Sequence, residues 1–378
     1  MKRISVDCRS LETVCGVAVY TRELLQALIP MDAQNHYQLL LRKKSSYPDV
    51  GPNLTKRVLR LPGRLTHFFW KRWRVLPMDL FLGRTDVFFS PNFTLPHLRP
   101  RVHTVITVHD LAFLKMPEDV TDASNAFLGY WVGDSIKRAD RIIADSRCTK
   151  QDIVELFGVA GDRVVVVYPG CNERFRVLAV DATAGAALRT KYGLPERFIL
   201  CHGTLEPRKN IPVLLKAFAS ARSKLGGTKL VISGKRGWLF ESIFSTVTEL
   251  GLSEDVCFPG FIEEEDLPRL YNECEFFCCV SKYEGFGLPV VEAMACGKAV
   301  IVSDVSSLPE VVAEAGIRID PTDSEALSTA MVRLATNTIE REMLEQASLR
   351  RAAAFSWTTA ARETLAVLES VGEIGTAG

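Results

Sequence analysis

The feature that most constrains this chain is an alternation of short apolar runs with amphipathic segments, which occurs twice along its 378 residues. Short apolar runs bounded by turn residues predict buried strands, and the segments between them have helical spacing. Strands joined by helices form parallel sheets with helices on both faces. In the first half these runs are Arg3–Val6, Gln38–Leu41, Asp86–Phe89, Thr104–Val108, Arg141–Ala144 and Val164–Tyr168.

A break separates the two alternations. Tyr168–Asn172 has turn chemistry, and a polar stretch without strand character continues to about Pro195. The sequence therefore predicts two doubly wound domains, residues 1–170 and 171–355, with ligands at the carboxyl ends of the strands and a large ligand in the cleft between the domains. The strands expected in the second half are Phe198–Cys201, Lys229–Ile232, Val256–Phe258, Phe276–Val280, Ala299–Val302 and Ile317–Ile319.

Several predicted helices have recognisable ends. Val19–Ile29 carries an apolar stripe and is expected to stop at Pro30. Ser146–Phe157 opens with a serine cap, and the last helix, Trp357–Leu368, is preceded by one. No strand follows this last helix, so it either closes the second domain or packs back on the first.

Composition excludes several classes of protein. Apolar residues make up 47% and charged residues 24%, as in soluble folded chains. The net charge of +1 and the lack of nucleic-acid-reading motifs argue against a nucleic-acid partner. Neither a secretory signal nor a membrane-spanning stretch is found. The ten cysteines are therefore expected to be reduced and buried, in a cytoplasmic protein.

The segment 42–84 departs from this balance. It holds eleven Lys or Arg and two Asp, a net charge of +9, so the rest of the chain sums to −8. Phe68, Phe69, Trp70 and Trp73 are interleaved with the basic residues. This composition is typical of a segment that lies on an anionic membrane, here its inner face. The other interpretation is a solvated basic surface whose aromatic residues face the core.

Two adjacent cations lie beyond the first strand of the second half. Gly203 follows that strand and allows close backbone approach, and Arg208 and Lys209 come just before the next helix. Arginine offers a planar fork to a phosphate, and lysine offers a compact charge. Because cations at a helix start oppose the helix dipole, these residues favour a diphosphate site over a structural role.

Two carboxylates flank a glycine-rich turn after the strand Phe276–Val280. Glu284 lies in the loop and Glu292 about one turn into the following helix, with seven residues between them. Gly285 and Gly287 let main-chain N–H groups point at a ligand beside a helix N-terminus, which attracts anions. Both carboxylates can then face one cleft and accept hydrogen bonds from sugar or ribose hydroxyls.

This constellation resembles the retaining GT-B glycosyltransferases, and within them the large family four of bacterial polysaccharide and glycolipid enzymes. The resemblance covers nearly all of the second half and, in the first half, Thr107–Leu111, Ala144–Ile153 and Tyr168–Cys171. It implies an α/β GT-B fold of two doubly wound Rossmann-like domains facing across a cleft. It also implies sugar transfer from a nucleotide-sugar to an acceptor hydroxyl with retained anomeric configuration, and a C-terminal helix 356–372 that packs back on the first domain.

Matched position by position, the resemblance implies roles for individual residues. Arg208 and Lys209 would hold the leaving diphosphate, Glu284 would bind donor-sugar hydroxyls, and Glu292 would bind the ribose. His109 would reach the donor sugar from the first domain and is grouped with Arg208, Lys209 and Glu284 as catalytic. The other expected substrate contacts are Gly16, Asp110, Gly203, Ile262 near the base, and the main chain of Gly285, Phe286, Gly287 and Leu288.

The loop Thr13–Tyr20 departs from the family pattern. Gly16 remains, but Ala18 and Val19 stand where a second glycine and a basic residue are common. This loop leaves open an alternative, a sugar-nucleotide-binding homologue without transfer activity. It also lacks the G-x-G-x-x-G turn that a nicotinamide-dependent oxidoreductase would need.

The chemistry expected of this chain needs no metal or other cofactor. No Asp-x-Asp motif occurs, so Arg208, Lys209 and a helix N-terminus are expected to stabilise the leaving group. No carboxylate nucleophile is evident, and the resemblance favours attack by the acceptor on the leaving group's own face. The likeness of GTLEPRKNI to bacterial mannosyltransferases favours GDP-mannose as donor, with UDP-sugars left open. The expected acceptor is a glycolipid or oligosaccharide in surface polysaccharide synthesis.

Overall fold

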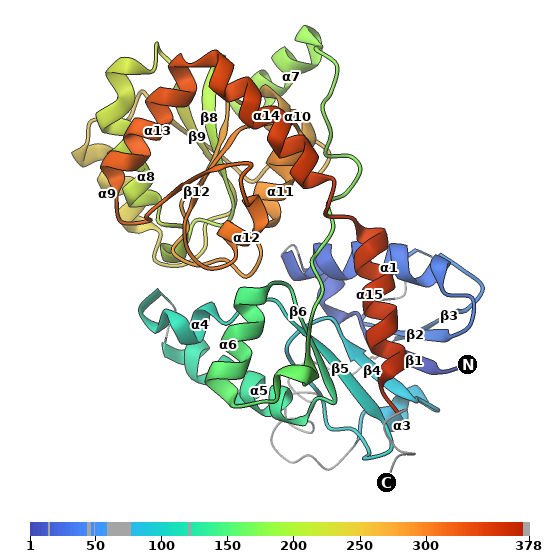
Figure 1. Ribbon diagram of the computed structural model, residues 1–378. Helices are drawn as coiled ribbons and strands as arrows, with labels where there is room; N and C mark the ends of the chain where they lie inside the picture. The colour runs from blue at the N-terminus through green and yellow to red at the C-terminus, as the bar shows by residue number, and fades with distance from the viewer. Residues whose placement is uncertain (14–15, 44–46, 49, 59–76, 120–121, 373–378) are drawn as a thin grey trace. The chain divides into compact units, whose positions relative to one another are not determined.

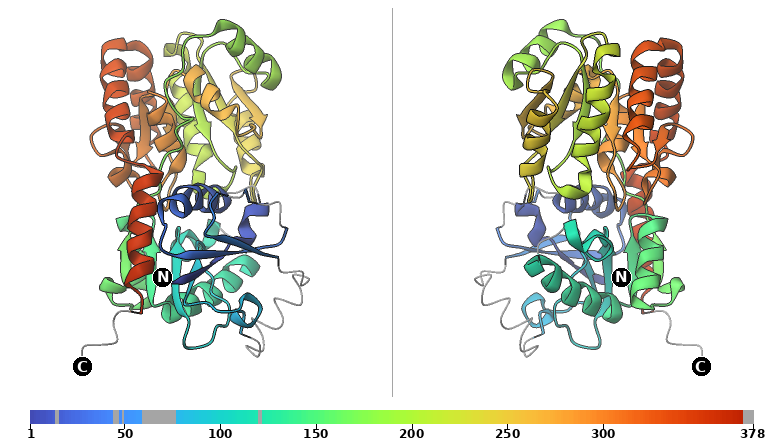
Figure 2. Two further views of the ribbon diagram at one scale, coloured as in Figure 1. Left: turned by 90° about the vertical axis from the view of Figure 1, so that its right-hand side faces the viewer. Right: turned by 90° about the vertical axis from the view of Figure 1, so that its left-hand side faces the viewer.

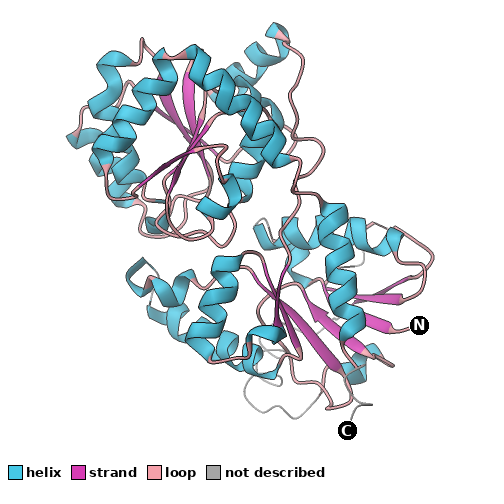
Figure 3. Cartoon of the chain, in the orientation of Figure 1, coloured by secondary structure: helices cyan, strands magenta, loops and turns pink. Residues whose placement is uncertain are grey.

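The computed structural model divides the chain into two compact units, each built on one parallel sheet (Figure 1). It describes residues 1–13, 16–43, 47–48, 50–58, 77–119 and 122–372. Unit 1 consists of residues 1–115, 122–170 and 356–378, and unit 2 of residues 116–121 and 171–355. In each unit, helices lie on both sides of the central sheet (Figure 3). The prediction of doubly wound α/β domains is confirmed.

The sheet of unit 1 has seven parallel strands in the order β3-β2-β1-β4-β5-β6-β7. The order reverses direction between β1 and β4, and ligands bind beyond the carboxyl ends of strands at such a switch point. The strands are β1 (Arg3–Asp7), β2 (His36–Leu41), β3 (Leu54–Val58), β4 (Val87–Ser90), β5 (His103–Val108), β6 (Arg141–Ala144) and β7 (Val164–Val166).

Strand β3 lies in the basic segment 42–84, where no strand was expected. Leu54–Val58 pairs with β2 at the edge of the sheet, and its residues are half-buried or exposed. An edge strand has one neighbour and can carry lysine and arginine, so it lacks the apolar signature that revealed the inner strands. Phe68, Phe69, Trp70 and Trp73 lie outside the described residues.

The helices of unit 1 include one from the far end of the sequence. Helix α15 packs beside α1 in the same core cluster, and two further views show it along this unit (Figure 2). The Lys2 ammonium donates to the main-chain oxygens of Glu369, in the last turn of this helix, and of Val371, which follows it as the C-cap. The helices are α1 (Gly16–Met31), α3 (Asp79–Leu82), α4 (Ala112–Lys115), α5 (Asp122–Arg138), α6 (Arg147–Phe157) and α15 (Trp357–Ser370).

The expected helix ends are close to the observed ones. Ser146 accepts a hydrogen bond from the Thr149 amide as the N-cap of α6, and Ser356 caps α15 in the same way. Helix α1 continues one residue past the predicted stop, with Pro30 inside its last turn. A proline that close to the end removes little of the helical hydrogen bonding.

The sheet of unit 2 has six parallel strands in the order β10-β9-β8-β11-β12-β13. The strands are β8 (Phe198–His202), β9 (Lys229–Ser233), β10 (Val256–Gly260), β11 (Phe277–Cys279), β12 (Val300–Ser303) and β13 (Ile317–Ile319). The helices are α7 (Ala182–Tyr192), α8 (Ile211–Ala221), α9 (Glu241–Glu249), α10 (Leu267–Glu273), α11 (Leu288–Ala295), α12 (Leu308–Val312), α13 (Ser324–Thr336) and α14 (Thr338–Ala352). Helices α8, α9 and α13 share one core cluster with the sheet.

The described residues 116–119 pack in unit 2, although the predicted first domain includes them. Asp119 explains the difference. Its carboxylate lies 3.2 Å from the Lys282 ammonium, and its main-chain oxygen accepts a hydrogen bond of 2.6 Å from the Trp238 indole. Both partners belong to unit 2.

Two absences hold for the described parts of the chain. No helix there is both long and apolar enough to cross a bilayer. None of the nine described cysteines takes part in a disulfide bond; six of them are buried, whereas Cys148, Cys171 and Cys257 are half-buried, although burial was expected of all.

The seating of α15 in unit 1 generates a prediction about Gly170. A Cβ atom on Gly170 would lie 2.1 Å from the Trp357 nitrogen and 2.5 Å from the Ser356 carbonyl carbon. We expect Gly170→Ala to displace the start of α15 and destabilise unit 1 by roughly 1–3 kcal/mol. That corresponds to a thermal transition lowered by about 2–4 °C per kcal/mol, measurable by scanning calorimetry of the full chain.

Gly161→Ala is the matched control. A Cβ atom at Gly161 would meet only the Val154 side chain at 4.0 Å, which is ordinary contact. Its thermal transition should stay at the wild-type temperature. If Gly170→Ala also melts like the wild type, the close packing of residues 170 and 356–357 is wrong.

Candidate active site

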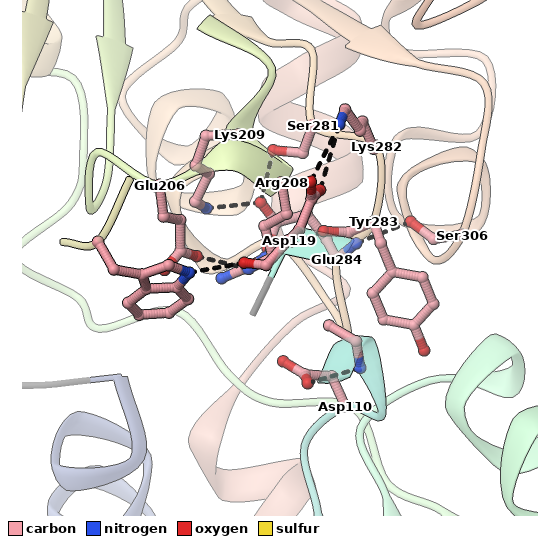
Figure 4. A network of polar contacts seen from close by, with 12 residues as sticks. Asp110, Asp119, Glu206, Arg208, Lys209, Ser281, Lys282, Tyr283, Glu284 and Ser306 are labelled. Atoms are coloured by element: carbon pink, nitrogen blue, oxygen red, sulfur yellow. Dashed lines mark hydrogen bonds and ion pairs between the residues drawn. The ribbon is translucent and has the colours of Figure 1, made fainter. Parts of the chain in front are cut away.

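The predicted cations and the first predicted carboxylate meet at the carboxyl edge of the sheet in unit 2. Arg208 and Lys209 lie in the short turn Pro207–Lys209 after β8, and Glu284 lies in the loop between β11 and α11. Strands β8 and β11 are parallel neighbours, so the two loops emerge side by side. Figure 4 shows the Arg208, Lys209 and Ser281 side chains directed at the Glu284 carboxylate.

Both cations hold the Glu284 carboxylate directly. Arg208 Nη1 lies 2.7 Å from Glu284 Oε2, and Lys209 Nζ lies 2.5 Å from Oε1. The Ser281 hydroxyl also donates to Oε1, at 2.7 Å. The side chains are 21%, 11% and 8% exposed for Arg208, Lys209 and Glu284, so these ion pairs are largely shielded from water.

The electrostatics of the cluster keep Glu284 ionised. Burial alone raises the pKa of a carboxyl group, but the charges of Arg208 and Lys209 outweigh it here and lower the pKa of Glu284 to about 2. Glu284 therefore accepts hydrogen bonds and does not donate a proton at any pH near neutrality.

A second carboxylate, Glu206, completes the cluster and was missed by the sequence analysis. Its Oε1 lies 2.5 Å from Arg208 Nε, and its side chain is 4% exposed. Burial raises the pKa of Glu206 even beside Arg208. The only signal in the sequence is its position two residues before Arg208, which does not by itself reveal that the side chain turns inward.

The turn that carries the cations is fixed to the neighbouring loop. The Lys282 amide donates to the Arg208 carbonyl at 2.8 Å. Asn210, with φ 59°, ends the turn and donates from Nδ2 to the carbonyl oxygens of Val280 (3.0 Å) and Pro321 (2.7 Å). These bonds tie the β8 loop to the end of β11 and to residues beyond β13, so the cations have a defined position.

Packing against Lys209 explains why position 203 is a glycine, which was not predicted from the sequence. A Cβ atom there would lie 3.2 Å from Lys209 Cε, so the glycine leaves room for the lysine side chain. A Cβ atom on the facing Gly234 would lie 1.9 Å from the Gly203 oxygen. The two glycines let the ends of β8 and β9 approach each other.

The glycine-rich turn is held by serines from the loop after β12. The Glu284 amide donates to the Ser306 hydroxyl at 3.0 Å, and the Ser307 hydroxyl bonds to the Glu284 and Phe286 oxygens, both at 2.9 Å. Gly287, with φ 103°, immediately precedes α11, and a Cβ atom there would lie 2.9 Å from Leu308. Both the positive φ angle and the close approach of Leu308 therefore exclude a side chain at position 287.

Several predicted contact residues have buried side chains. Phe286 is buried and packs edge-on against Phe355, with ring centroids 5.4 Å apart. Ile262 and Gly285 are also buried, while Leu288 is half-buried as the first residue of α11. At Phe286 and Ile262 only main-chain groups are available to a ligand, because the side chains belong to the core.

The second predicted carboxylate, that of Glu292, accepts a hydrogen bond from Tyr271. The Tyr271 hydroxyl on α10 lies 2.8 Å from Glu292 Oε2 on α11. Tyr271 is fully buried and was not among the residues that the sequence analysis singled out.

In unit 1 the predicted His109 lies at the carboxyl end of β5, paired with Asp145 at the end of β6. His109 Nδ1 lies 2.7 Å from Asp145 Oδ2, and Nε2 lies 3.2 Å from the Pro91 oxygen. Burial opposes the charged imidazole, but the Asp145 carboxylate outweighs it and raises the pKa of His109. Asp145 was missed, although it directly follows a predicted strand.

The two other predicted residues of unit 1 have local roles. Asp110 accepts a hydrogen bond of 3.1 Å from the Ala112 amide at the start of α4. Gly16 is the first residue of α1, and a Cβ atom on it would meet no described atom within 4 Å. Packing within the described residues therefore does not require glycine at position 16.

Among the described residues, no three or more His, Cys, Asp or Glu side chains come together in a group that could hold a metal ion.

Two family models match the chain. The one described as "Glycosyl transferases group 1" matches residues 187–351, and the one described as "Glycosyltransferase Family 4" matches residues 14–175. The O-antigen chain mannosyltransferase B of Escherichia coli is 33% identical over 285 residues, which are 74% of this chain and 73% of that protein. The serotype-specific mannosyltransferase WbdA of Escherichia coli is 34% identical over 76% of this chain, which spans 35% of that longer protein.

Solved structures share the fold at lower identity. Sucrose-phosphate synthase from Thermosynechococcus elongatus superposes with a TM-score of 0.77 at 21% identity, covering 98% of both chains. WaaG, a glycosyltransferase involved in lipopolysaccharide biosynthesis, gives a TM-score of 0.73 at 15% identity, covering 97% of this chain and all of that one. With both halves matched by family models and mannosyltransferases among its relatives, this chain belongs to the group 1, family 4 glycosyltransferases and has their GT-B fold.

Proposed function

We propose that this glycosyltransferase transfers a hexose to a lipid-linked or oligosaccharide acceptor in bacterial surface polysaccharide synthesis. The proposed hexose is mannose, and its donor is GDP-mannose. The transfer retains the anomeric configuration and needs no metal ion. The observation that carries the proposal is the pair Arg208 and Lys209, held at the carboxyl edge of unit 2 by buried carboxylates. The names of the Escherichia coli relatives, which are O-antigen and serotype-specific mannosyltransferases, support mannose and a polysaccharide product.

The proposed reaction separates charge across one bond. When the bond between the anomeric carbon and the diphosphate oxygen breaks, its electron pair stays on the diphosphate and positive charge develops on the sugar. Arg208 and Lys209 would bind the diphosphate and stabilise its added charge, as fixed cations do for other leaving groups. The acceptor oxygen then bonds to the anomeric carbon from the same face, and its proton passes to the departing phosphate oxygen.

The carboxylates would bind hydroxyl groups in this scheme. Glu284, ionised at neutral pH, would accept hydrogen bonds from the donor sugar, and Glu292 from the ribose. His109 would reach the sugar by exchanging its bond to the Pro91 carbonyl for one to a sugar hydroxyl, while Asp145 keeps the ring oriented. Main-chain amides at Phe286, Gly287 and Leu288 would lie against the sugar and phosphates at the start of α11.

The donor and the metal are tested together. We expect GDP to raise the melting temperature more than UDP, ADP or dTDP, equally in EDTA and in magnesium, because protein cations bind the diphosphate. Mannose transfer from GDP-mannose should likewise proceed at the same rate in both. A larger rise in melting temperature with UDP would mean that the donor is a UDP-sugar and not GDP-mannose. Loss of turnover in EDTA, with recovery in magnesium or manganese, would overturn the metal-free mechanism.

Two substitutions in the charged cluster should have opposite effects on binding. Lys209→Ala removes a charge-assisted contact and should weaken GDP binding roughly ten- to a hundredfold by calorimetry. Glu284→Gln removes the anion that competes for the cations, so GDP binding should be kept or tightened. Transfer by Glu284→Gln should nevertheless fall by roughly a hundredfold, since the sugar loses a charged acceptor.

Exposed residues of the same unit supply the matched controls. Lys224→Ala and Glu249→Gln delete the same groups on the surface of unit 2 and should leave both binding and transfer at wild-type values. If Glu284→Gln transfers sugar at the wild-type rate, or if Lys209→Ala binds GDP with wild-type affinity, the charged cluster is not the donor site that we propose.

The acceptor proposal extends to the membrane through segment 42–84. With a net charge of +9 and interleaved aromatic residues, this segment should bind vesicles containing anionic lipid at low salt. Binding should be lost at about 1 M salt, where the Debye length is about 3 Å, and on vesicles of neutral lipid alone. Co-sedimentation measures both; a protein that stays in the supernatant with anionic vesicles at low salt does not make this contact.

A further inference from the structure

The bond between Tyr271 and Glu292 links the core of unit 2 to the second predicted carboxylate. Tyr271 lies on α10 and Glu292 on α11, and the hydroxyl donates to Oε2 at 2.8 Å. Tyr271 is fully buried, whereas Glu292 is half-buried. A half-buried carboxylate is thus held by a donor that solvent does not reach.

The position of the Tyr271 hydroxyl is fixed by three neighbouring rings. Its ring packs edge-on against Phe175, Phe277 and His202, with centroids 5.8, 5.7 and 6.0 Å away and planes inclined by 76°, 62° and 78°. Phe277 belongs to β11 and His202 ends β8. Because these strands form the centre of the sheet, the Tyr271 ring packs against the core, which limits movement of its hydroxyl.

The protonation states around this contact are constant near neutral pH. Burial, and then the charge of Glu292, raise the pKa of Tyr271 well above that of a free phenol, so the hydroxyl stays a donor. Burial and the nearby Lys209 lower the pKa of His202 to about 4, so that ring is neutral. A binding experiment near pH 7 therefore probes the hydrogen bond without titrating either side chain.

A half-buried glutamate side chain has three rotatable bonds. When the carboxylate binds a ligand these bonds lose conformational freedom, and this loss weakens binding. A hydrogen bond from a rigid donor orders them beforehand, which strengthens binding of the groups that the carboxylate faces.

We propose that Tyr271 is a positioning residue that gives the nucleotide site its preference for ribose, by holding the Glu292 carboxylate in the orientation that accepts ribose hydroxyls. The inference rests on the proposed function, in which Glu292 binds the ribose. It adds a residue that touches no part of the donor.

The test compares ribose with deoxyribose in four proteins. The probes are GDP or UDP, whichever gives the larger thermal shift, and its 2′-deoxy and 3′-deoxy forms, with affinities measured by calorimetry. The proteins are the wild type, Tyr271→Phe, Glu292→Gln and the double variant. Tyr271→Phe removes one oxygen atom and leaves the ring to fill its place in the core.

We expect the wild type to bind the ribonucleotide about tenfold more tightly than at least one deoxy form, the effect of one hydrogen bond to a charged group. Tyr271→Phe should reduce this ratio toward one by weakening the ribonucleotide alone, with deoxynucleotide affinity unchanged. Glu292→Gln should reduce it too, and the double variant no further, because the two residues act through one contact.

Tyr37→Phe is the matched control. Tyr37 is a fully buried tyrosine whose hydroxyl donates to a carboxylate, that of Asp32, at 2.6 Å in unit 1. Its substitution deletes the same group in an equivalent setting and should leave the ribose preference at the wild-type ratio, whatever it does to stability.

The outcomes separate this inference from the proposed function. A wild-type ratio in Tyr271→Phe with a reduced ratio in Glu292→Gln overturns the role of Tyr271 and leaves the function standing. Equal affinity of the wild type for ribose and deoxyribose forms overturns the inference while diphosphate binding remains. Failure of both GDP and UDP to bind the wild type overturns both.

Discussion

The ion pairs of the Glu284 carboxylate with Arg208 and Lys209 are the interaction on which the charged carboxyl edge of unit 2 depends. Arg208 and Lys209 are adjacent like charges with little exposure, and such a pair is stable only when anions neutralise it. Glu284 and Glu206 supply that neutralisation in the protein itself. A diphosphate would therefore not enter a vacant positive pocket. It would compete with Glu284 for the same N–H groups, so that binding exchanges one anion for another.

Sheet topology decides which residues can form such clusters. Arg208 and Glu284 are far apart in sequence, but they follow β8 and β11, which are parallel neighbours. His109 and Asp145 follow β5 and β6, which are neighbours in the other sheet. In each unit a charged pair forms at the carboxyl edge, because parallel strands deliver the side chains that follow them to one edge.

The sequence predicts features that depend on local pattern, and it misses those that depend on strand order or side-chain direction. Buried strands and serine caps leave local signatures, and β3 does not, since an edge strand need not be apolar. Asp145 required knowing that β6 lies beside β5. Glu206 and Tyr271 required knowing that their side chains turn inward. The same limit applies to Phe286, whose motif does not distinguish a main-chain contact from a buried ring.

The two glutamates of the motif, Glu284 and Glu292, are held by different kinds of donor, so their carboxylates can respond differently when a ligand binds. Tyr271 is a neutral donor from the core, so it orients the Glu292 carboxylate without itself placing a positive charge beside it. Glu284 is held by Arg208 and Lys209, which in the proposed reaction must also hold the diphosphate. In the proposed reaction, growing negative charge on the leaving group would draw both cations toward it and weaken their contacts with Glu284. The Glu284 carboxylate would then interact more strongly with the sugar, at the stage when positive charge develops there. In the proposed reaction a single charged cluster would thus act on both halves of the charge separation, starting from the ionised Glu284 that the two cations maintain before the donor binds.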